Sequence, residues 1–202
     1  MGSNRAGEPP AVTTFGEHAE ENLQFIRRAM ERSSTFTAVP GLGGAAMGIV
    51  GLAAAILAAN QHSAERWLIV WLLAAIVAVG IGVTAIWRKA ARSGVPLAGT
   101  VGRRFAMSLA APLVAGSALT WGVWMNGDRS LIPAVWLLLY GTAVLAGGAL
   151  SVAAVQLLGV AFMALGIAAL ATPSAWGTVW LGIGFGGLQL VFGLYIARKH
   201  GG

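Results

Sequence analysis

The chain has 202 residues, of which 57% are hydrophobic and 10% charged, and its mean hydropathy is +0.75. It contains no cysteine, which excludes disulfides, thiolate catalysis and cysteine metal sites. From Phe105 to Ala197 only Asp128 and Arg129 carry a charge. Apolar runs of about 20 residues, each long enough to cross a hydrocarbon core as a helix, follow one another. The composition therefore predicts an all-α polytopic membrane protein.

The first 37 residues are polar and lack the apolar segment of a secretory signal peptide. Residues 1–13 contain Gly and Pro and predict a disordered tail. Residues 14–33 predict a short amphipathic cytoplasmic helix, because Thr14 and Glu17 have the spacing of a capping box. Its basic residues favour a helix lying in the membrane interface, whereas its narrow apolar stripe favours a solvated helix packed on the loop between spans two and three. The sequence leaves both interpretations open.

Six membrane spans account for the chain after residue 38. They are predicted at 38–59, 67–87, 105–125, 131–149, 151–171 and 175–197. Pro40 falls in the first turn of span one, and Pro112 predicts a kink in span three. The 41 uncharged residues from 131 to 171 are too long for one crossing, and Gly147 and Gly148 offer the turn between spans four and five.

The basic residues give the expected topology. With six spans and both termini cytoplasmic, only Arg66 and Arg129 lie outside. The cytoplasmic side then holds Arg5, Arg27, Arg28, Arg32, Arg88, Lys89, Arg92, Arg103, Arg104, Arg198 and Lys199. This asymmetry satisfies the positive-inside rule. A single crossing over 131–171 would force the basic C-terminus outside.

Glycine pairs at small-xxx-small spacing predict close helix contacts. Gly44 and Gly48 form one pair in span one, and Gly182 and Gly186 form another in span six. Packing within the chain and a homodimer face are the two roles that such pairs support. Residues 182–187 also match GxGxxG, but that nucleotide-binding motif needs a strand before it and a helix N-terminus after it. A position within a span excludes this chemistry.

The predicted spans contain no ionisable side chain other than tyrosine, which argues against an ordinary proton- or sodium-coupled carrier. Three uncharged polar residues are the candidate intramembrane contacts: Gln156, Gln189 and Tyr140. Gln156 and Gln189 lie at similar depth on adjacent spans, which would allow them to hydrogen-bond to one another. Such groups serve either to hold helices together or to line a polar binding pocket.

Tryptophans gather towards the predicted outer half, as Trp67, Trp71, Trp121, Trp124, Trp136, Trp176 and Trp180. An aromatic belt at the headgroups is the ordinary explanation, and an outer vestibule for a ligand is the alternative. The three histidines fall in separate surface segments, so we predict neither a metal site nor a bound cofactor. No residue set has the pattern of a catalytic site, and we do not expect an enzyme.

Two segments of the chain resemble those of a known protein family. They are residues 20–48, EENLQFIRRAMERSSTFTAVPGLGGAAMG, and the ending YIARKHGG. In these segments the chain resembles an uncharacterised family of small multipass bacterial inner-membrane proteins. The resemblance implies a bacterial inner-membrane location and no particular chemistry.

Two functions fit the sequence. The first is a non-enzymatic membrane subunit or regulatory module, whose basic cytoplasmic face binds anionic headgroups or a membrane or cytoplasmic protein partner, and not nucleic acid. The residues expected to make these contacts are Arg27, Arg28, Arg32, Arg88, Lys89, Arg92, Arg103 and Arg104. The alternative is a permease or channel for a small neutral or hydrophobic solute, built around Gln156, Gln189 and Tyr140. A continuous polar cavity would favour the permease, and a dry core of Gly and Ala would count against it.

Overall fold

The computed structural model describes residue 20 and residues 22–26, 39–93 and 99–200. The chain divides into two compact units, Met1–Ser34 and Thr35–Gly202. In the first unit residue 20 and residues 22–26 are helical and exposed. The rest of the amphipathic helix expected over 14–33, with Arg27, Arg28 and Arg32, lies outside the described residues.

The second unit is helical throughout its regular structure, and the described residues contain no strand. The first three long helices are α2 (Gly41–Ala59), α3 (Ala64–Ser93) and α4 (Thr100–Asn126). They are followed by a 3-10 turn (Arg129–Leu131), α5 (Ile132–Gly148) and α6 (Ala153–Leu170). The last span comprises a 3-10 turn (Ser174–Trp176), α7 (Gly177–Leu181), a π-helix (Gly182–Leu188) and α8 (Gln189–His200). The described residues thus form 6 helices long and apolar enough to cross a membrane.

The helix ends follow from local sequence. Gly127 ends α4 with φ 85°, a left-handed conformation that glycine adopts without a steric penalty. The uncharged stretch from 131 to 171 does break, between the end of α5 at Gly148 and the start of α6 at Ala153. Pro173 precedes the turn into the last span. Pro112 lies inside α4.

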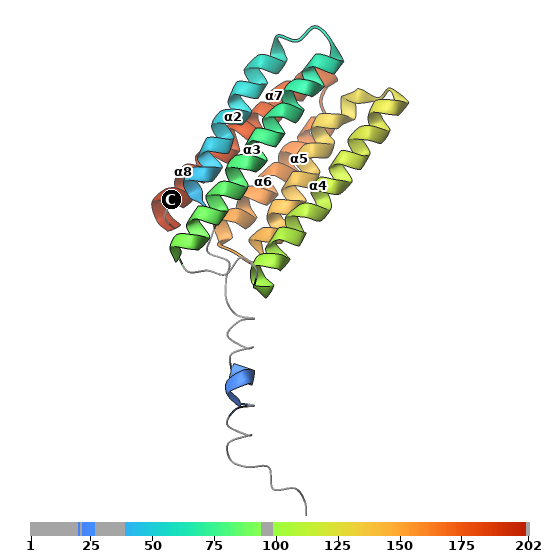
Figure 1. The fold of residues 1–202 in the computed structure, drawn as a ribbon. Coiled ribbons are helices and arrows are strands. Elements are labelled where there is room, and N and C mark those ends of the chain that lie inside the picture. The colour runs from blue at the N-terminus through green and yellow to red at the C-terminus, as the bar shows by residue number, and fades with distance from the viewer. Residues whose placement is uncertain (1–19, 21, 27–38, 94–98, 201–202) are drawn as a thin grey trace, which may run out of the picture. The chain divides into compact units, whose positions relative to one another are not determined.

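The helices form two layers, which Figure 1 shows side by side. In one layer α2 packs against both α3 and α8, and in the other α5 packs against both α4 and α6. The α7 segment contacts α2, α5 and α6, and it joins the two layers. Helices α3 and α4 are therefore the front edges of the two layers, although they are neighbours in sequence (Figure 1).

The glycine pairs in span one and span six face one another within the chain. A Cβ added at Gly48 would lie 2.5 Å from the Leu190 backbone nitrogen, and one at Gly44 would lie 3.3 Å from the Cα of Gly193. From the other side, a Cβ at Gly182 would lie 2.9 Å from the Cβ of Ala55. These positions lie in one interface between α2 and the last span, where backbones approach as small residues permit.

The last span changes to a π-helix over Gly182–Leu188, the segment GIGFGGL that contains the GxGxxG match. Glycine has low helix propensity and lets a neighbouring backbone come close, which favours a locally widened helix here. The π-helix changes the register of the residues that follow it, and Gln189 is the first of these. Such bulges occur frequently at functional sites.

Tryptophan N–H groups join helices at the end of the bundle that holds Glu65 and Arg129. Nε1 of Trp67 on α3 donates to Oγ1 of Thr178 at 2.8 Å. Arg129 pairs with Glu65 at 3.3 Å. These contacts tie α3 to the start of the last span and to the turn before α5, so Trp67 takes part in packing within the chain.

Candidate functional site

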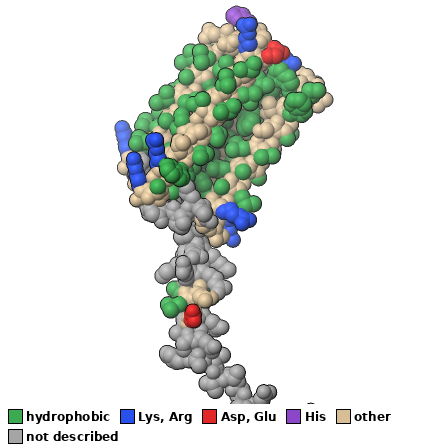
Figure 2. Space-filling view, viewed as in Figure 1, with side chains coloured by type: hydrophobic (Ala, Val, Ile, Leu, Met, Phe, Trp, Pro, Cys, Tyr) green, Lys and Arg blue, Asp and Glu red, His purple; other side chains and the backbone are tan. Residues whose placement is uncertain are grey.

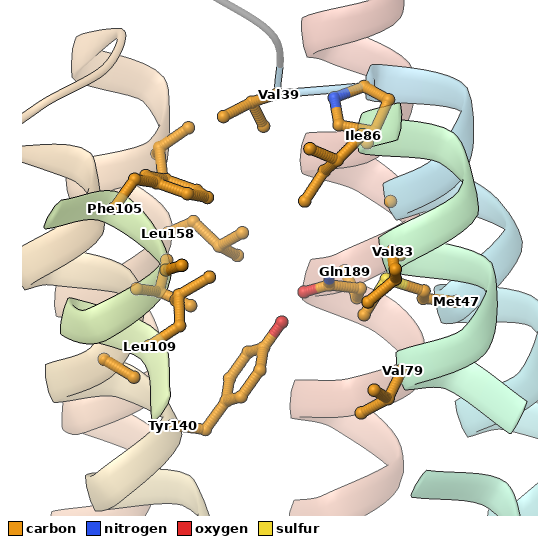
Figure 3. Close-up of a pocket in the computed structure, with 18 of the residues that line it drawn as sticks. Val39, Met47, Val79, Val83, Ile86, Phe105, Leu109, Tyr140, Leu158 and Gln189 are labelled. Atoms are coloured by element: carbon orange, nitrogen blue, oxygen red, sulfur yellow. The ribbon is translucent and has the colours of Figure 1, made fainter. Parts of the chain in front are cut away.

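A cavity of about 540 Å³ lies between the two layers, as Figure 3 shows. Its volume is within the range of about 300–1,000 Å³ that is usual for small-molecule sites. Val83 of α3, with 61% of its surface exposed, and the exposed Ala110 of α4 line it from opposite sides. The cavity therefore opens between α3 and α4. We call this opening the α3–α4 gap.

One face of each edge helix lines the cavity. On α4 these residues are Gly102, Phe105, Ala106, Leu109, Ala110 and Leu113, and on α3 they are Val79, Gly82, Val83, Ile86 and Trp87. Their spacing of three and four residues keeps them on one side of each helix. Three small residues of α4 form a stripe that borders the cavity: Gly102, Ala106 and Ala110. This stripe is the sequence signal that could have indicated the cavity.

The inner wall of the cavity brings together two of the candidate polar residues, Tyr140 of α5 and Gln189 of α8. The Tyr140 hydroxyl points towards the Gln189 side chain (Figure 3). The tyrosine ring is held between Phe162 and Phe185, with ring centroids 4.8 and 4.9 Å away. Because aromatic packing on two sides fixes the ring, the hydroxyl has a defined position in the cavity.

Gln189 is buried, with 7% of its surface exposed, and its Oε1 atom has no hydrogen-bond partner. Leaving a buried acceptor unsatisfied costs about 1–3 kcal/mol, and native structures rarely tolerate this without a reason. The rest of the lining is apolar apart from Tyr140 and the Trp87 indole, and it contains no charged side chain. A buried amide oxygen without a hydrogen-bond partner, in an otherwise apolar cavity, is the chemical feature that distinguishes this site.

Gln156 and Gln189 do not hydrogen-bond to one another. Instead, Nε2 of Gln156 donates to the Gly148 carbonyl at 3.2 Å, across the turn between α5 and α6. Similar depth allows such a bond but does not fix the direction in which each side chain points. The structure therefore keeps Tyr140 and Gln189 together and places Gln156 outside the cavity lining.

All the described basic residues except Arg66 and Arg129 lie at the end of the bundle where α3 and α8 end and α4 begins (Figure 2). This basic end comprises Arg88, Lys89, Arg92, Arg103, Arg104, Arg198 and Lys199. Nζ of Lys89 donates to the carbonyl of Val39 at 3.0 Å, and Val39 lines the cavity. Ala90 and Phe105 pack together beside it and are buried. The basic end thus borders the cavity at Val39 and Phe105.

The described residues include no group of three His, Asp or Glu side chains that could hold a metal ion. Comparison with protein-family models, curated proteins and solved structures gave no match for the chain. The fold and the cavity define a multipass membrane protein of helical class.

Proposed function

We propose that this protein binds a largely apolar molecule from the bilayer in the cavity between α3 and α4, without converting it chemically. The observation that carries the proposal is the buried, unpartnered Oε1 of Gln189 in an otherwise apolar cavity of about 540 Å³. A cavity of this kind offers a ligand apolar contact area and one oriented polar contact, which is the usual composition of a small-molecule site.

The lining argues against passage of a polar solute. Moving an amide or hydroxyl from water into an apolar space without compensating hydrogen bonds costs roughly 2–7 kcal/mol. The cavity offers Tyr140, Gln189 and the Trp87 indole as its polar side chains, which form no continuous polar path. A carrier for a hydrophobic solute is the form of the permease hypothesis that agrees with this lining. Acid–base catalysis would need a positioned titratable group, and the lining supplies no carboxylate or imidazole.

Filling the cavity is expected to abolish ligand binding. Ala110→Phe places a ring at the α3–α4 gap, where the alanine lines the cavity and is exposed. The probe is a long-chain hydrocarbon carrying a diazirine, photolysed with the protein in nanodiscs, and labelled residues are identified by peptide mass spectrometry. In the native protein we expect labels on Val144 and Leu158, which line the cavity and are each only 6% exposed.

The matched control is Ala111→Phe, which places the same ring on the neighbouring, exposed position of α4 outside the lining. It should leave the labelling of Val144 and Leu158 unchanged. Labels confined to the outward-facing residues of the native bundle would refute the proposal. So would equal labelling of Leu158 in the Ala110→Phe variant.

The basic end supports a second candidate function, that of a membrane subunit or regulatory module. We propose that this end, together with Arg27, Arg28 and Arg32, faces the cytoplasm of a bacterial cell and contacts anionic headgroups or a protein partner. The support is the clustering of cations at one end of the helices, since cytoplasmic segments are enriched in Lys and Arg and attract anionic lipids.

Replacing Arg27, Arg28 and Arg32 together with Gln is expected to abolish recovery of a stoichiometric partner in affinity purification from native membranes. The removed guanidinium groups are the ones proposed to make the contact. Arg66→Gln is the control, because this arginine lies near Glu65 at the opposite end. Unchanged recovery from the triple variant would reject the N-terminal arginines as the contact site.

A further inference from the structure

We infer that the ligand is a neutral long-chain amphiphile with a terminal hydroxyl, bound hydroxyl-first against Gln189 and Tyr140 with its chain directed to the α3–α4 gap. This inference rests on the proposed function and specifies the ligand's chemistry.

The polar group of the ligand must be a hydrogen-bond donor. Oε1 of Gln189 is an acceptor, and it is buried without a partner. A ligand O–H would supply the missing donor. The Tyr140 hydroxyl points to the same place and can donate to the ligand oxygen in return (Figure 3). A hydroxyl, which donates and accepts at one atom, therefore fits the pair better than an ether or a ketone.

The polar group must also be neutral. No charged side chain lines the cavity, so a carboxylate or ammonium placed beside Gln189 would be buried without a counter-ion. A carboxylate would in addition bring a second acceptor against Oε1. The Lys89 side chain is not part of the lining; it donates to the carbonyl of Val39, which lines the cavity at the basic end.

The geometry of the cavity orients the ligand. Tyr140 and Gln189 lie near the middle of their spans, where the surrounding bilayer offers a hydroxyl no hydrogen bond. From there the lining is apolar out to Val83 and Ala110 at the gap. A chain leaving through the gap stays at hydrocarbon depth. Binding hydroxyl-first thus satisfies the polar group inside the protein and keeps the chain in an apolar environment throughout.

Competition against the diazirine probe tests the inference with three ligands of equal chain length: 1-dodecanol, dodecyl methyl ether and dodecanoate. The ether replaces the hydroxyl hydrogen with a methyl group and so cannot donate, and dodecanoate carries the charge. We expect 1-dodecanol to displace labelling of Leu158 at a concentration about tenfold lower than either of the others needs, as expected for one buried hydrogen bond. This comparison uses the native chain and depends on no variant.

Variants test which residues cause the preference for the alcohol over the ether. Gln189→Leu is expected to remove the advantage of the alcohol over the ether, and Tyr140→Phe to reduce it. Gln156→Leu and Tyr195→Phe are the controls, since Gln156 contacts Gly148 and Tyr195, 44% exposed, lies beneath Lys199. Both controls should retain the full preference. Gln189→Leu also removes an unsatisfied buried carbonyl. The midpoint of thermal unfolding of this variant, measured without ligand, should therefore not fall below that of the native protein.

The outcomes separate the inference from the function on which it rests. Equal displacement by alcohol and ether, or a preference that survives Gln189→Leu, overturns the hydroxyl assignment but leaves cavity binding standing. If dodecanoate displaces the probe most strongly, and this effect is lost in Lys89→Gln, the ligand is an anion whose charged group lies at the basic end. That result would also overturn the hydroxyl assignment. No labelling of Val144 or Leu158 by the probe would refute both proposals.

Discussion

Gly193→Ala is expected to lower the free energy of unfolding by about 3 kcal/mol, at the upper end of typical overpacking effects. A Cβ at Gly193 would meet the Ala45 backbone nitrogen, and it would lie 2.7 Å from the Gly44 carbonyl carbon and 2.8 Å from the Cα of Ala45. Each of these is a backbone atom, so no side-chain rotation can relieve the overlap, and α2 must move away from α8. Unfolding in mixed detergent and SDS, followed by circular dichroism, measures the change.

Gly187→Ala is the matched control for this prediction. It lies in the π-helix shortly before Gly193, and a Cβ there meets nothing within 4 Å. The same substitution should be neutral or stabilising by up to about 1 kcal/mol, because alanine has the higher helix propensity. If both variants unfold at the same SDS fraction, the close approach of α2 and α8 is not what holds the last span in place.

The spans were predictable because the bilayer sets both their length and their polarity. The break in the uncharged stretch from 131 to 171 followed from length alone. The end of α3 was not predicted correctly: the predicted span stopped at 87, whereas the helix continues to Ser93. Hydropathy reports where a helix leaves the hydrocarbon, and helical hydrogen bonding continues through Arg88 and Arg92 into the polar region.

The site was only partly predictable. Tyr140 and Gln189 were identifiable as polar residues in apolar helices, but their meeting depends on the rotation of α8, which follows a π-helix that no periodicity rule indicates. The cavity itself arises because α3 and α4, joined by a short connection, lie at the edges of different layers. Six helices joined by short loops permit several arrangements, so the sequence left the order of the helices in the bundle open.

Cross-linking α3 to α4 is expected to reduce probe labelling of Val144 and Leu158 to background. Two other boundaries of the cavity are packed: glycine contacts bring α2 against α8, and Ala90 and Phe105 are buried together at the basic end. A ligand using those routes would have to separate packed backbones or buried side chains. The α3–α4 gap, bordered by the exposed Val83 and Ala110, requires only that two lipid-facing edges remain apart.

The chain contains no cysteine, so the pair Val83→Cys and Ala110→Cys can be joined specifically. Reducible bis-methanethiosulfonate linkers of increasing length would bridge the gap, and the probe would be added afterwards. Labelling of Leu158 should disappear with the shortest linker that reacts at both ends and return on reduction. Each single-cysteine variant, treated identically, controls for the bulk of the reagent. Labelling that persists in the cross-linked protein would mean that the ligand reaches Gln189 by another route. Helices α3 and α4 would then line the cavity without forming its entrance.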